Sequence, residues 1–285
     1  MTRKHLYSIF LALITSGVIN AQSSLLNAKS VETIGKKTEE QLIADNDAPL
    51  PYGYIDDRDV LWSKVVWEVI DLNQKINLPY YYPIDVSNMS ENRRSLFDAL
   101  YNGIQSGKIK EAYKDSYFNA KITRQEINGL LFNARQNGNN IDTFKISTQD
   151  IEAFKIKGMW YFDKRQGELK YRLLAIAPMG PDVQTLGVAE IEEDQLYELF
   201  WVFYPSAREV LFKTEVFNPK NSSHPISYDH LLNARRFSST IVQEENIYNN
   251  RGISDYIRGN SLFQLLEADR IKEDIRNREM DMWNY

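Results

Sequence analysis

The sequence predicts an α+β fold, with a central antiparallel sheet flanked by helices from the N-terminal and C-terminal thirds of the chain. Hydrophobic residues recur at helical spacing before about residue 140 and after about residue 218, whereas alternating spacing dominates between them. The 285-residue chain contains no cysteine, so its core has to form without disulfides. A chain of this length can bury a core large enough for one domain.

The first 48 residues are expected to precede the globular domain. A basic start (MTRKH), a short apolar stretch (LYSIFLALI) and the small residue Ala21 form the pattern of a cleavable secretory signal over residues 1–21. The apolar stretch is far shorter than the roughly 20 residues that span a bilayer. Residues 22–48 are polar and lack an apolar period, which predicts a flexible leader. We therefore expect an exported, soluble protein with a single globular domain over 49–285.

Three helices are expected in the first part of this domain, residues 49–140. They are placed at 58–73 with Asp57 as the N-cap, at 91–105 with Ser90 as the N-cap, and from the capping box of Thr123 and Glu126 to Gly138. In the first of these helices, Trp67 falls on the polar side. A surplus tryptophan there suggests that a second element or a partner covers it.

The sheet is expected in the middle part, residues 141–217. Alternating apolar residues predict a strand at 154–162, a turn at 164–167 and an antiparallel partner strand at 169–173. The stretch LYELFWVFYP, residues 196–205, is apolar on both faces, which is typical of a central strand, and Pro205 is expected to end it.

Helical patterns return in the last part, residues 218–285, with helices expected at 228–243 and 261–278. The apolar residues of the last helix are expected to face a core; they are Leu262, Phe263, Leu265, Leu266, Ile271 and Ile275. Segment 59–67 matches 229–237 at an offset of 170, and SLFDAL (95–100) matches SLFQLL (261–266) at 166. These matches raise the possibility of duplicated helical pairs, although shared periodicity alone also produces short matches of this kind.

No catalytic, cofactor-binding or metal-binding motif is found. His224 and His230 share no helix face, Asp229 alone does not complete a metal site with them, and no nucleophile elbow precedes Ser222 or Ser223. Glycine-rich phosphate loops are absent as well. A net charge of −5 disfavours nucleic acid and anionic lipid as partners. The sequence therefore predicts a protein without enzymatic activity.

The segment 49–85 is rich in acids and aromatic rings, which suits either a carbohydrate-binding cleft or a protein interface. Its aspartates 56, 57 and 59 are too close along the chain for an opposed catalytic pair and are explained as helix-capping residues. A periplasmic or secreted carbohydrate-binding or polysaccharide-degrading protein nevertheless stays open as the alternative function.

Three consecutive tyrosines in this segment, Tyr80, Tyr81 and Tyr82, lie between two prolines. An extended segment cannot point all three rings inward, so at least one should be exposed. Tyrosine is enriched in interface cores. We therefore take these three tyrosines and Trp67 as candidate partner-binding residues, with a loop folded back over its own domain as the competing interpretation.

Four long segments together resemble the GldN/PorN family of the Bacteroidetes. They are PYGYIDDRDVLWSKVVWEVIDLNQKINLPYYYP, RRSLFDALYNGI, DKRQGELKYRLLAIAPM and FWVFYPSAREVLFKTEVFNP, and the resemblance runs from about Pro49 to the end of the chain. It implies a non-enzymatic periplasmic subunit of the type IX protein secretion system, which in gliding species also supports motility.

The resemblance also implies specific partners. Family members assemble with a GldK/PorK-like outer-membrane lipoprotein, and with further copies of themselves, into a ring under the outer membrane. They are thought to contact a GldM/PorM-like motor protein in the periplasm. The expected location is therefore the inner face of the outer membrane, reached through the lipoprotein and without direct membrane insertion.

Overall fold

The computed structural model describes residues 48–84, 93–137, 140–186, 195–218 and 226–282. The expected signal peptide, nearly all of the expected leader, the Ser90 cap, Ser222, Ser223 and His224 lie outside the described residues. The elements reported below belong to one compact unit, formed by residues 49–86 and 93–285.

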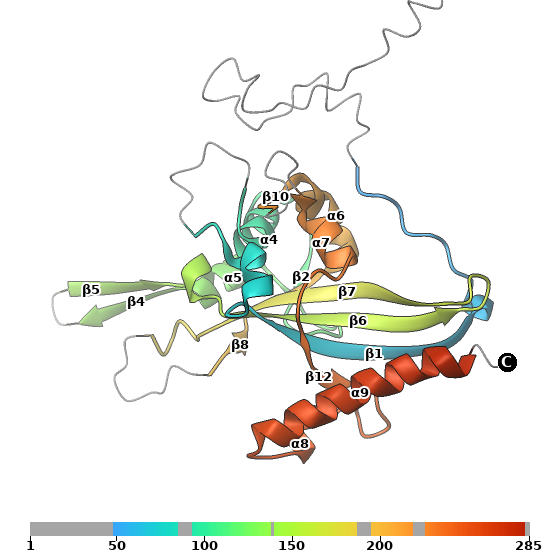
Figure 1. Cartoon of the computed structure of the whole chain (residues 1–285). Coiled ribbons are helices and arrows are strands. Elements are labelled where there is room, and N and C mark those ends of the chain that lie inside the picture. Colours follow the sequence, from blue (N-terminus) through green and yellow to red (C-terminus); the bar gives the residue numbers. More distant parts are fainter. Residues whose placement is uncertain (1–47, 85–92, 138–139, 187–194, 219–225, 283–285) are drawn as a thin grey trace, which may run out of the picture. The chain divides into compact units, whose positions relative to one another are not determined.

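An eight-stranded sheet is the centre of this unit, and each neighbouring pair of its strands is antiparallel (Figure 1). The strand order is β12-β1-β6-β7-β9-β2-β3, with β8 also paired to β7. The strands are β1 (Val60–Asp71), β2 (Ala112–Tyr113), β3 (Lys121–Ile122), β6 (Ala153–Asp163), β7 (Glu168–Gly180), β8 (Tyr197–Glu198), β9 (Trp201–Phe203) and β12 (Thr240–Glu244). The predicted α+β class and the predicted β6–β7 hairpin are confirmed.

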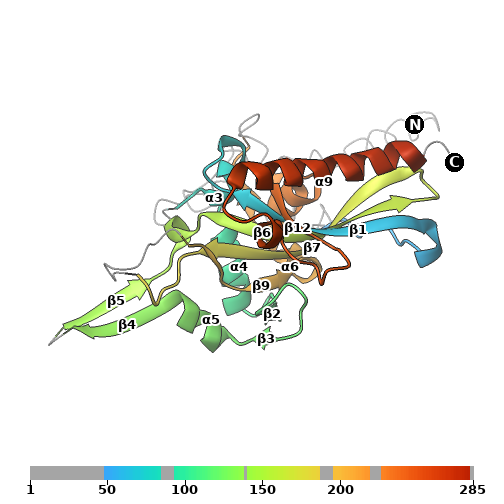
Figure 2. The ribbon, with the colours of Figure 1, turned by 90° about the horizontal axis from the view of Figure 1, so that it is seen from below.

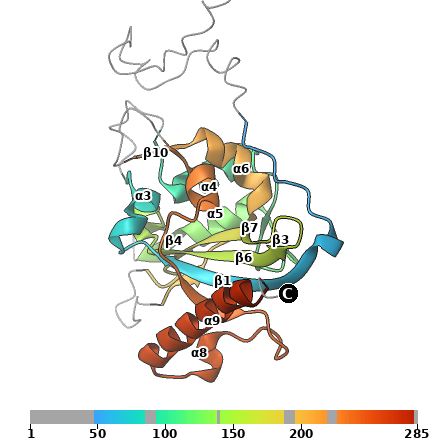
Figure 3. The ribbon, with the colours of Figure 1, turned by 45° about the vertical axis from the view of Figure 1, so that its right-hand side comes forward.

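Helices cover both faces of the sheet (Figure 3). On one face lie α3 (Leu78–Tyr81), α4 (Leu96–Gln105), α6 (Tyr204–Lys213) and α7 (Tyr228–Asn233), and their apolar residues join the inner residues of β6 and β7 in the largest core. On the opposite face lie α8 (Ile253–Tyr256) and α9 (Ser261–Met282), which bury a smaller core against Val66 of β1 and Ile241 of β12. No helix among the described residues has the length and apolarity to cross a membrane.

The predicted helix at 58–73 is wrong, because these residues form strand β1. The strand is rich in β-branched and aromatic residues, which pack well on a pleated surface. It pairs with β6 along one edge and with β12 along the other, and both of its faces are covered: Val66 packs with α8 and α9, whereas Ile70 joins the largest core on the opposite face. A strand covered on both faces has a nearly continuous apolar pattern that mimics a broad helical face. Asp56 rather than Asp57 caps the short 3₁₀ turn η3 (Asp57–Asp59) that precedes it.

Other helix boundaries in the first part of the domain also differ from the predicted ones. Ser95 rather than Ser90 caps α4, accepting a hydrogen bond from the backbone N–H of Asp98 at 3.1 Å. The capping box of Thr123 and Glu126 is confirmed, but the helix that it starts, α5 (Arg124–Leu131), gives way to a strand at Phe132. The first part of the domain is therefore not purely helical.

Two further predictions are corrected in the second half of the chain. Pro205 stands in the first turn of α6 instead of ending a long strand, because proline fits helix N-termini, where its missing N–H is not needed. The expected helix at 228–243 ends at Asn233, and β12 follows it. Segment 59–67 therefore lies almost entirely in β1, whereas its match, 229–237, contains most of α7. The two segments are not copies of one helical unit.

A two-stranded ribbon projects from the body (Figures 1 and 2). It consists of β4 (Phe132–Asn137) and β5 (Asn140–Lys145), which pair with each other and form a sheet of their own. We call this ribbon the arm. The remaining short elements are η4 (Lys75–Asn77), η5 (Thr148–Asp150), and the paired strands β10 (Glu215–Val216) and β11 (Ile226–Ser227).

Candidate interaction surfaces

Trp67 is a core residue, with 1% of its surface exposed. Its indole Nε1 donates a hydrogen bond to Ser116 Oγ at 2.9 Å, and the Lys157 ammonium lies 4.9 Å from its ring centroid. Burial among aromatic rings lowers the pKa of Lys157. The element that covers Trp67 therefore comes from the same chain, namely the segment around Ser116, and leaves no surface of Trp67 for a partner.

The three consecutive tyrosines have different environments. Tyr80 is buried against the ring of Tyr228, and its hydroxyl donates to the carbonyl of Arg236 at 3.2 Å. Tyr81 is partly buried, whereas Tyr82 is 53% exposed. The expectation that at least one ring is exposed is confirmed for Tyr82. Partner binding by these residues stays a prediction, and Tyr82 is the ring best placed for it.

Acids of the segment 49–85 are held by arginines of the same chain. Asp56 forms an ion pair with Arg58 at 3.0 Å, and Asp59 forms one with Arg165 at 3.0 Å. The hydrogen bonds from Arg58 hold the pKa of Asp56 below its usual range. These two carboxylates do not oppose each other across a groove, as the acid pair of a glycosidase does.

Asp229, considered above as a metal or triad residue, belongs to a buried structural network. Its carboxylate accepts two hydrogen bonds from Arg208, at 2.8 and 2.9 Å, and one from the Tyr204 hydroxyl at 2.8 Å. The network ties α6 to α7. Within the described parts of the chain, no group of three or more His, Cys, Asp or Glu side chains could hold a metal ion.

A second buried ion pair joins β1 to the segment after α7. Glu68, 1% exposed, accepts two hydrogen bonds from the Arg235 guanidinium at 3.1 and 2.8 Å and a third, short one from the Ser239 hydroxyl. The guanidinium also stacks 3.9 Å from the ring centroid of Tyr171. This arrangement satisfies a buried carboxylate, and nothing in it points to catalysis.

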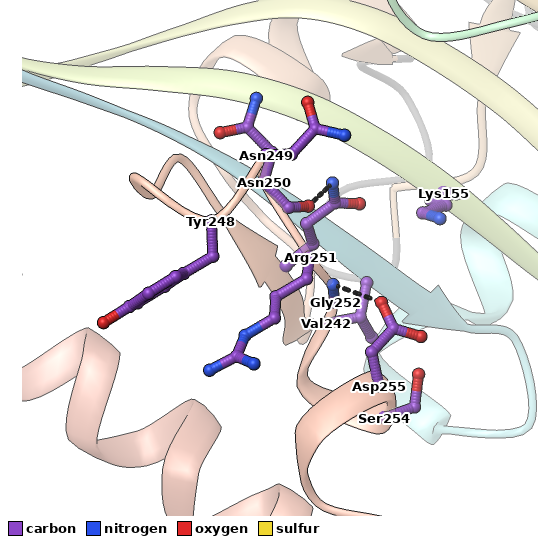
Figure 4. A pocket seen from close by; sticks show the side chains of 10 residues that line it. Lys155, Val242, Tyr248, Asn249, Asn250, Arg251, Gly252, Ser254 and Asp255 are labelled. Atoms are coloured by element: carbon purple, nitrogen blue, oxygen red, sulfur yellow. Dashed lines mark hydrogen bonds between the residues drawn. The ribbon is translucent and has the colours of Figure 1, made fainter.

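A polar hollow of about 450 Å³ lies beside β12 (Figure 4). The hydrogen bonds drawn there stay within the loop: Gln243 donates to the carbonyl of Asn250, and the N–H of Gly252 donates to the Asp255 carboxylate. The Lys155 ammonium at its rim forms an ion pair with Glu198 at 2.6 Å. Because these polar groups bond one another rather than converge on an empty position, the hollow is a feature of the loop and not a reaction site.

The first two turns of α9 expose four large apolar side chains. Leu262, Phe263, Leu265 and Leu266 are between 50% and 64% exposed. The expectation that they face a core is wrong, whereas it is confirmed for Ile271 and Ile275. At 3.6 residues per turn, Leu262 and Leu266 lie opposite the stripe that packs on the sheet, and Phe263 and Leu265 lie on either side of them. We call these four residues the α9 ridge.

The arm has one exposed face as well. Phe132 pairs with Lys145, and Gln136 pairs with Ile141, so these four residues share a face because residues opposite each other in an antiparallel ladder point to the same side. All four are exposed, Ile141 at 71%. Ala134 and Thr143 complete this arm face. Its two large apolar side chains, Phe132 and Ile141, stand at opposite ends of the ladder, with polar and small residues between them.

The family model described as "Gliding motility associated protein GldN" matches residues 55–284. The chain belongs to the GldN family. A search of the curated proteins found no match. Membership of the GldN family makes the chain a protein of the gliding motility and type IX secretion machinery, in a family that is a structural component and not a known enzyme family. The match begins just before η3 and includes the arm and the α9 ridge, so both surfaces belong to the GldN domain.

Sequence reasoning missed both of these surfaces. For the arm, a signal was present: Asn137-Gly138 between two alternating segments is a strong hairpin marker. For the α9 ridge, the apolar residues were recognised but were assigned to a core. Helical periodicity shows which residues share a face and does not show whether anything covers that face.

Proposed function

We propose that this protein is a non-enzymatic structural subunit of the type IX secretion system in the periplasm. It would assemble with a GldK/PorK-like outer-membrane lipoprotein, and with further copies of itself, into a ring under the outer membrane, and would contact a GldM/PorM-like motor protein. In a gliding host, the same assembly would serve motility. The observation that carries this proposal is the GldN family match over residues 55–284, nearly the whole described body.

Two features of the chain support a role in assembly. A signal-like segment at residues 1–21 is consistent with export to the periplasm. The arm face and the α9 ridge are two different exposed apolar surfaces on one body. A ring closes through head-to-tail contacts, in which each copy uses two different surfaces. The described body therefore offers what such a subunit needs.

The carbohydrate-binding alternative loses its main support. It requires exposed rings beside two acids in one groove, but Asp56 and Asp59 pair with arginines, and Trp67 and Tyr80 are buried. The ring of Tyr52, in the same segment, lies between the guanidinium groups of Arg172 and Arg208, at 4.5 and 4.1 Å from its centroid.

The test is gentle detergent extraction of the native host envelope, followed by capture of the protein through a C-terminal tag. We expect a very large particle that contains a lipoprotein in fixed ratio. A free monomer, recovered under conditions that preserve other envelope complexes, contradicts the proposal. A panel of glycans offered to that monomer then tests the alternative function by saturable binding.

A further inference from the structure

We propose that the arm face of one copy docks on the α9 ridge of the next copy, so that identical chains join head to tail. This inference rests on the proposed function and deepens it by naming the two surfaces through which neighbouring copies touch. The occupant of each surface is a second copy of this chain.

The arm needs a partner on one side only. On one of its faces, Asn133 and Arg135 donate hydrogen bonds to the carbonyls of Val183 and Leu186, and the Arg135 guanidinium stacks 5.3 Å from the ring centroid of Phe144. The opposite face, with Phe132 and Ile141, is exposed. A two-stranded ribbon is only marginally stable in water unless a hydrophobic face packs on something. The exposed arm face is therefore the face on which a neighbouring copy would pack.

The α9 ridge matches this face in character. It is a convex row of four aliphatic and aromatic side chains, and together they offer on the order of 400 Å² of apolar surface, judged against the 150–250 Å² of a whole aromatic side chain. The largest exposed apolar patch on a typical monomer is about 300–600 Å² and is often functional. The flat arm face, with apolar residues at diagonal corners, can lie across such a row.

Charge complementarity selects a second copy and fixes its orientation. Lys145 is exposed on the arm face beside Phe132, and Asp269 is exposed one turn beyond Leu265 and Leu266 on the outward side of α9. Within the described ranges, neither Lys145 nor Asp269 has an ion pair. Docking the arm on the ridge can bring this cation to this carboxylate. A ridge docked on another ridge leaves Lys145 of both copies outside the contact, and an arm docked on another arm leaves Asp269 of both copies outside it, so only arm-to-ridge docking can pair these two groups.

The contact joins different molecules because one chain cannot make it with itself. In both Figure 1 and Figure 2 the arm points away from the sheet and lies clear of α9. The two surfaces differ from each other, so the contact is heterologous and can continue from copy to copy.

The size of the contact predicts that it is weak for a single pair. Covering the ridge, about 400 Å², with an equal area of the arm buries about 800 Å² in total, below the roughly 1,200 Å² of a stable standard-size interface. In a closed ring each copy makes the contact twice, and every broken contact re-forms at high effective concentration. The isolated protein is therefore expected to be monomeric when dilute and to use this contact in the assembled envelope.

The absence of cysteine from the sequence allows a direct test by thiol crosslinking in the native host envelope. The pair Lys145→Cys and Asp269→Cys is placed in one chain, and the envelope is treated with a short bismaleimide, because the backbones of an ion-paired lysine and aspartate stand too far apart for a direct disulfide. We expect a ladder of dimer, trimer and higher species on a denaturing gel. Each single variant alone should give monomer, and the two single variants expressed together should give dimer only. As a matched control, Lys164→Cys, in the turn between β6 and β7, replaces Lys145→Cys and should abolish the ladder.

A second variant tests the apolar part of the contact. Adding Leu265→Ser and Leu266→Ser to the double-cysteine chain should reduce the crosslinked fraction at least tenfold, with the midpoint of thermal unfolding unchanged because both side chains are exposed.

Two results overturn the inference. The first is efficient dimerisation of Lys145→Cys alone, which shows arm-to-arm contact. The second is a double variant without a ladder. Tag capture from the same envelopes separates this failure from failure of the proposed function: a full-size particle with its lipoprotein but no ladder refutes only the docking surfaces, whereas recovery of a free monomer refutes both.

Discussion

Single arginines explain much of how this body is held together. Arg208 and Arg235 each donate two hydrogen bonds to one buried carboxylate while their guanidinium planes stack on aromatic rings. Guanidinium suits this role because it is planar, always charged and weakly hydrated. A buried pair of this kind adds little net stability compared with an apolar pair, but removal of one partner leaves an uncompensated charge. Replacing either carboxylate with a neutral side chain would therefore leave a buried guanidinium without its counter-charge.

Glu68→Gln should destabilise the folded chain by about 3–5 kcal/mol, because it leaves the Arg235 guanidinium buried without its counter-charge. Denaturant unfolding followed by circular dichroism measures the change. Arg58→Ala removes an ion pair at the exposed surface and serves as the control, with an unchanged midpoint expected. Equal midpoints for Glu68→Gln and the unchanged chain would show that the pair does not matter to stability.

Glu126 should titrate at a pH far below the usual range of a glutamate. Hydrogen bonds from the Lys114 ammonium and then from the backbone N–H and hydroxyl of Thr123 lower its pKa from 4.5 to about 2. A folded-state pKa below the unfolded value stabilises the fold above pH 4.5, and this contribution is lost as the pH falls toward 2. Carboxyl-carbon NMR should show the low midpoint. Lys114→Met should raise it, whereas Lys213→Met should leave it in place.

At the scale of elements, the sequence predicts those whose pattern depends on local chemistry. The β6–β7 hairpin follows from alternation and a turn, α5 from its capping box, and α9 from a sustained apolar period. β1 could not be identified in this way. Its apolar residues lie on both faces because a core forms on each side of the sheet, and α9, which covers one of these faces, comes from the last part of the chain. The helix-or-strand choice for β1 depends on contacts that periodicity does not contain.

Gly158 and Gly129 should respond in opposite ways to alanine. On β6, a Cβ at Gly158 would lie 2.0 Å from the buried hydroxyl oxygen of Tyr171, so Gly158→Ala should destabilise by about 1–3 kcal/mol. In α5, nothing lies within 4 Å of a Cβ at Gly129, and Gly129→Ala should stabilise by about 0.4–1 kcal/mol. Chemical denaturation of both variants checks the two signs, and a neutral Gly158→Ala would mean that Tyr171 moves aside at no cost.

At the scale of the whole molecule, the candidate surfaces were foreseen only in part. Three rings between two prolines implied an exposed tyrosine, and Tyr82 is exposed. A cover over Trp67 is expected from the sequence, which does not distinguish a second element from a partner. The burial of Tyr80 and the exposure of the α9 ridge could not be foreseen, because exposure is decided by neighbours from distant parts of the chain. Trp67 is covered by Ser116 and Lys157, which come from distant parts of the chain. The side chains of the α9 ridge are exposed among the described residues.

Tyr82→Ala and Tyr80→Ala separate assembly from folding. Tyr82→Ala removes an exposed ring, so it should leave the unfolding midpoint unchanged and, if this ring binds a partner, reduce the lipoprotein recovered with the tagged protein. Tyr80→Ala should destabilise the chain by about 3–5 kcal/mol, because it empties a core position. Wild-type recovery of the lipoprotein by Tyr82→Ala protein would contradict partner binding by Tyr82, the most exposed of the four candidate residues.

The pairing of β1 with β12 determines when the body can fold. β1 is among the first strands of the chain, but one of its two neighbours, β12, comes from the last part. A chain delivered from its N-terminus exposes the edge of β1 until residues 240–244 arrive, and exposed edges invite pairing between molecules. Long-range pairing of this kind is also slow. The interval between the emergence of β1 and the arrival of β12 is therefore the period in which this protein most needs protection by chaperones.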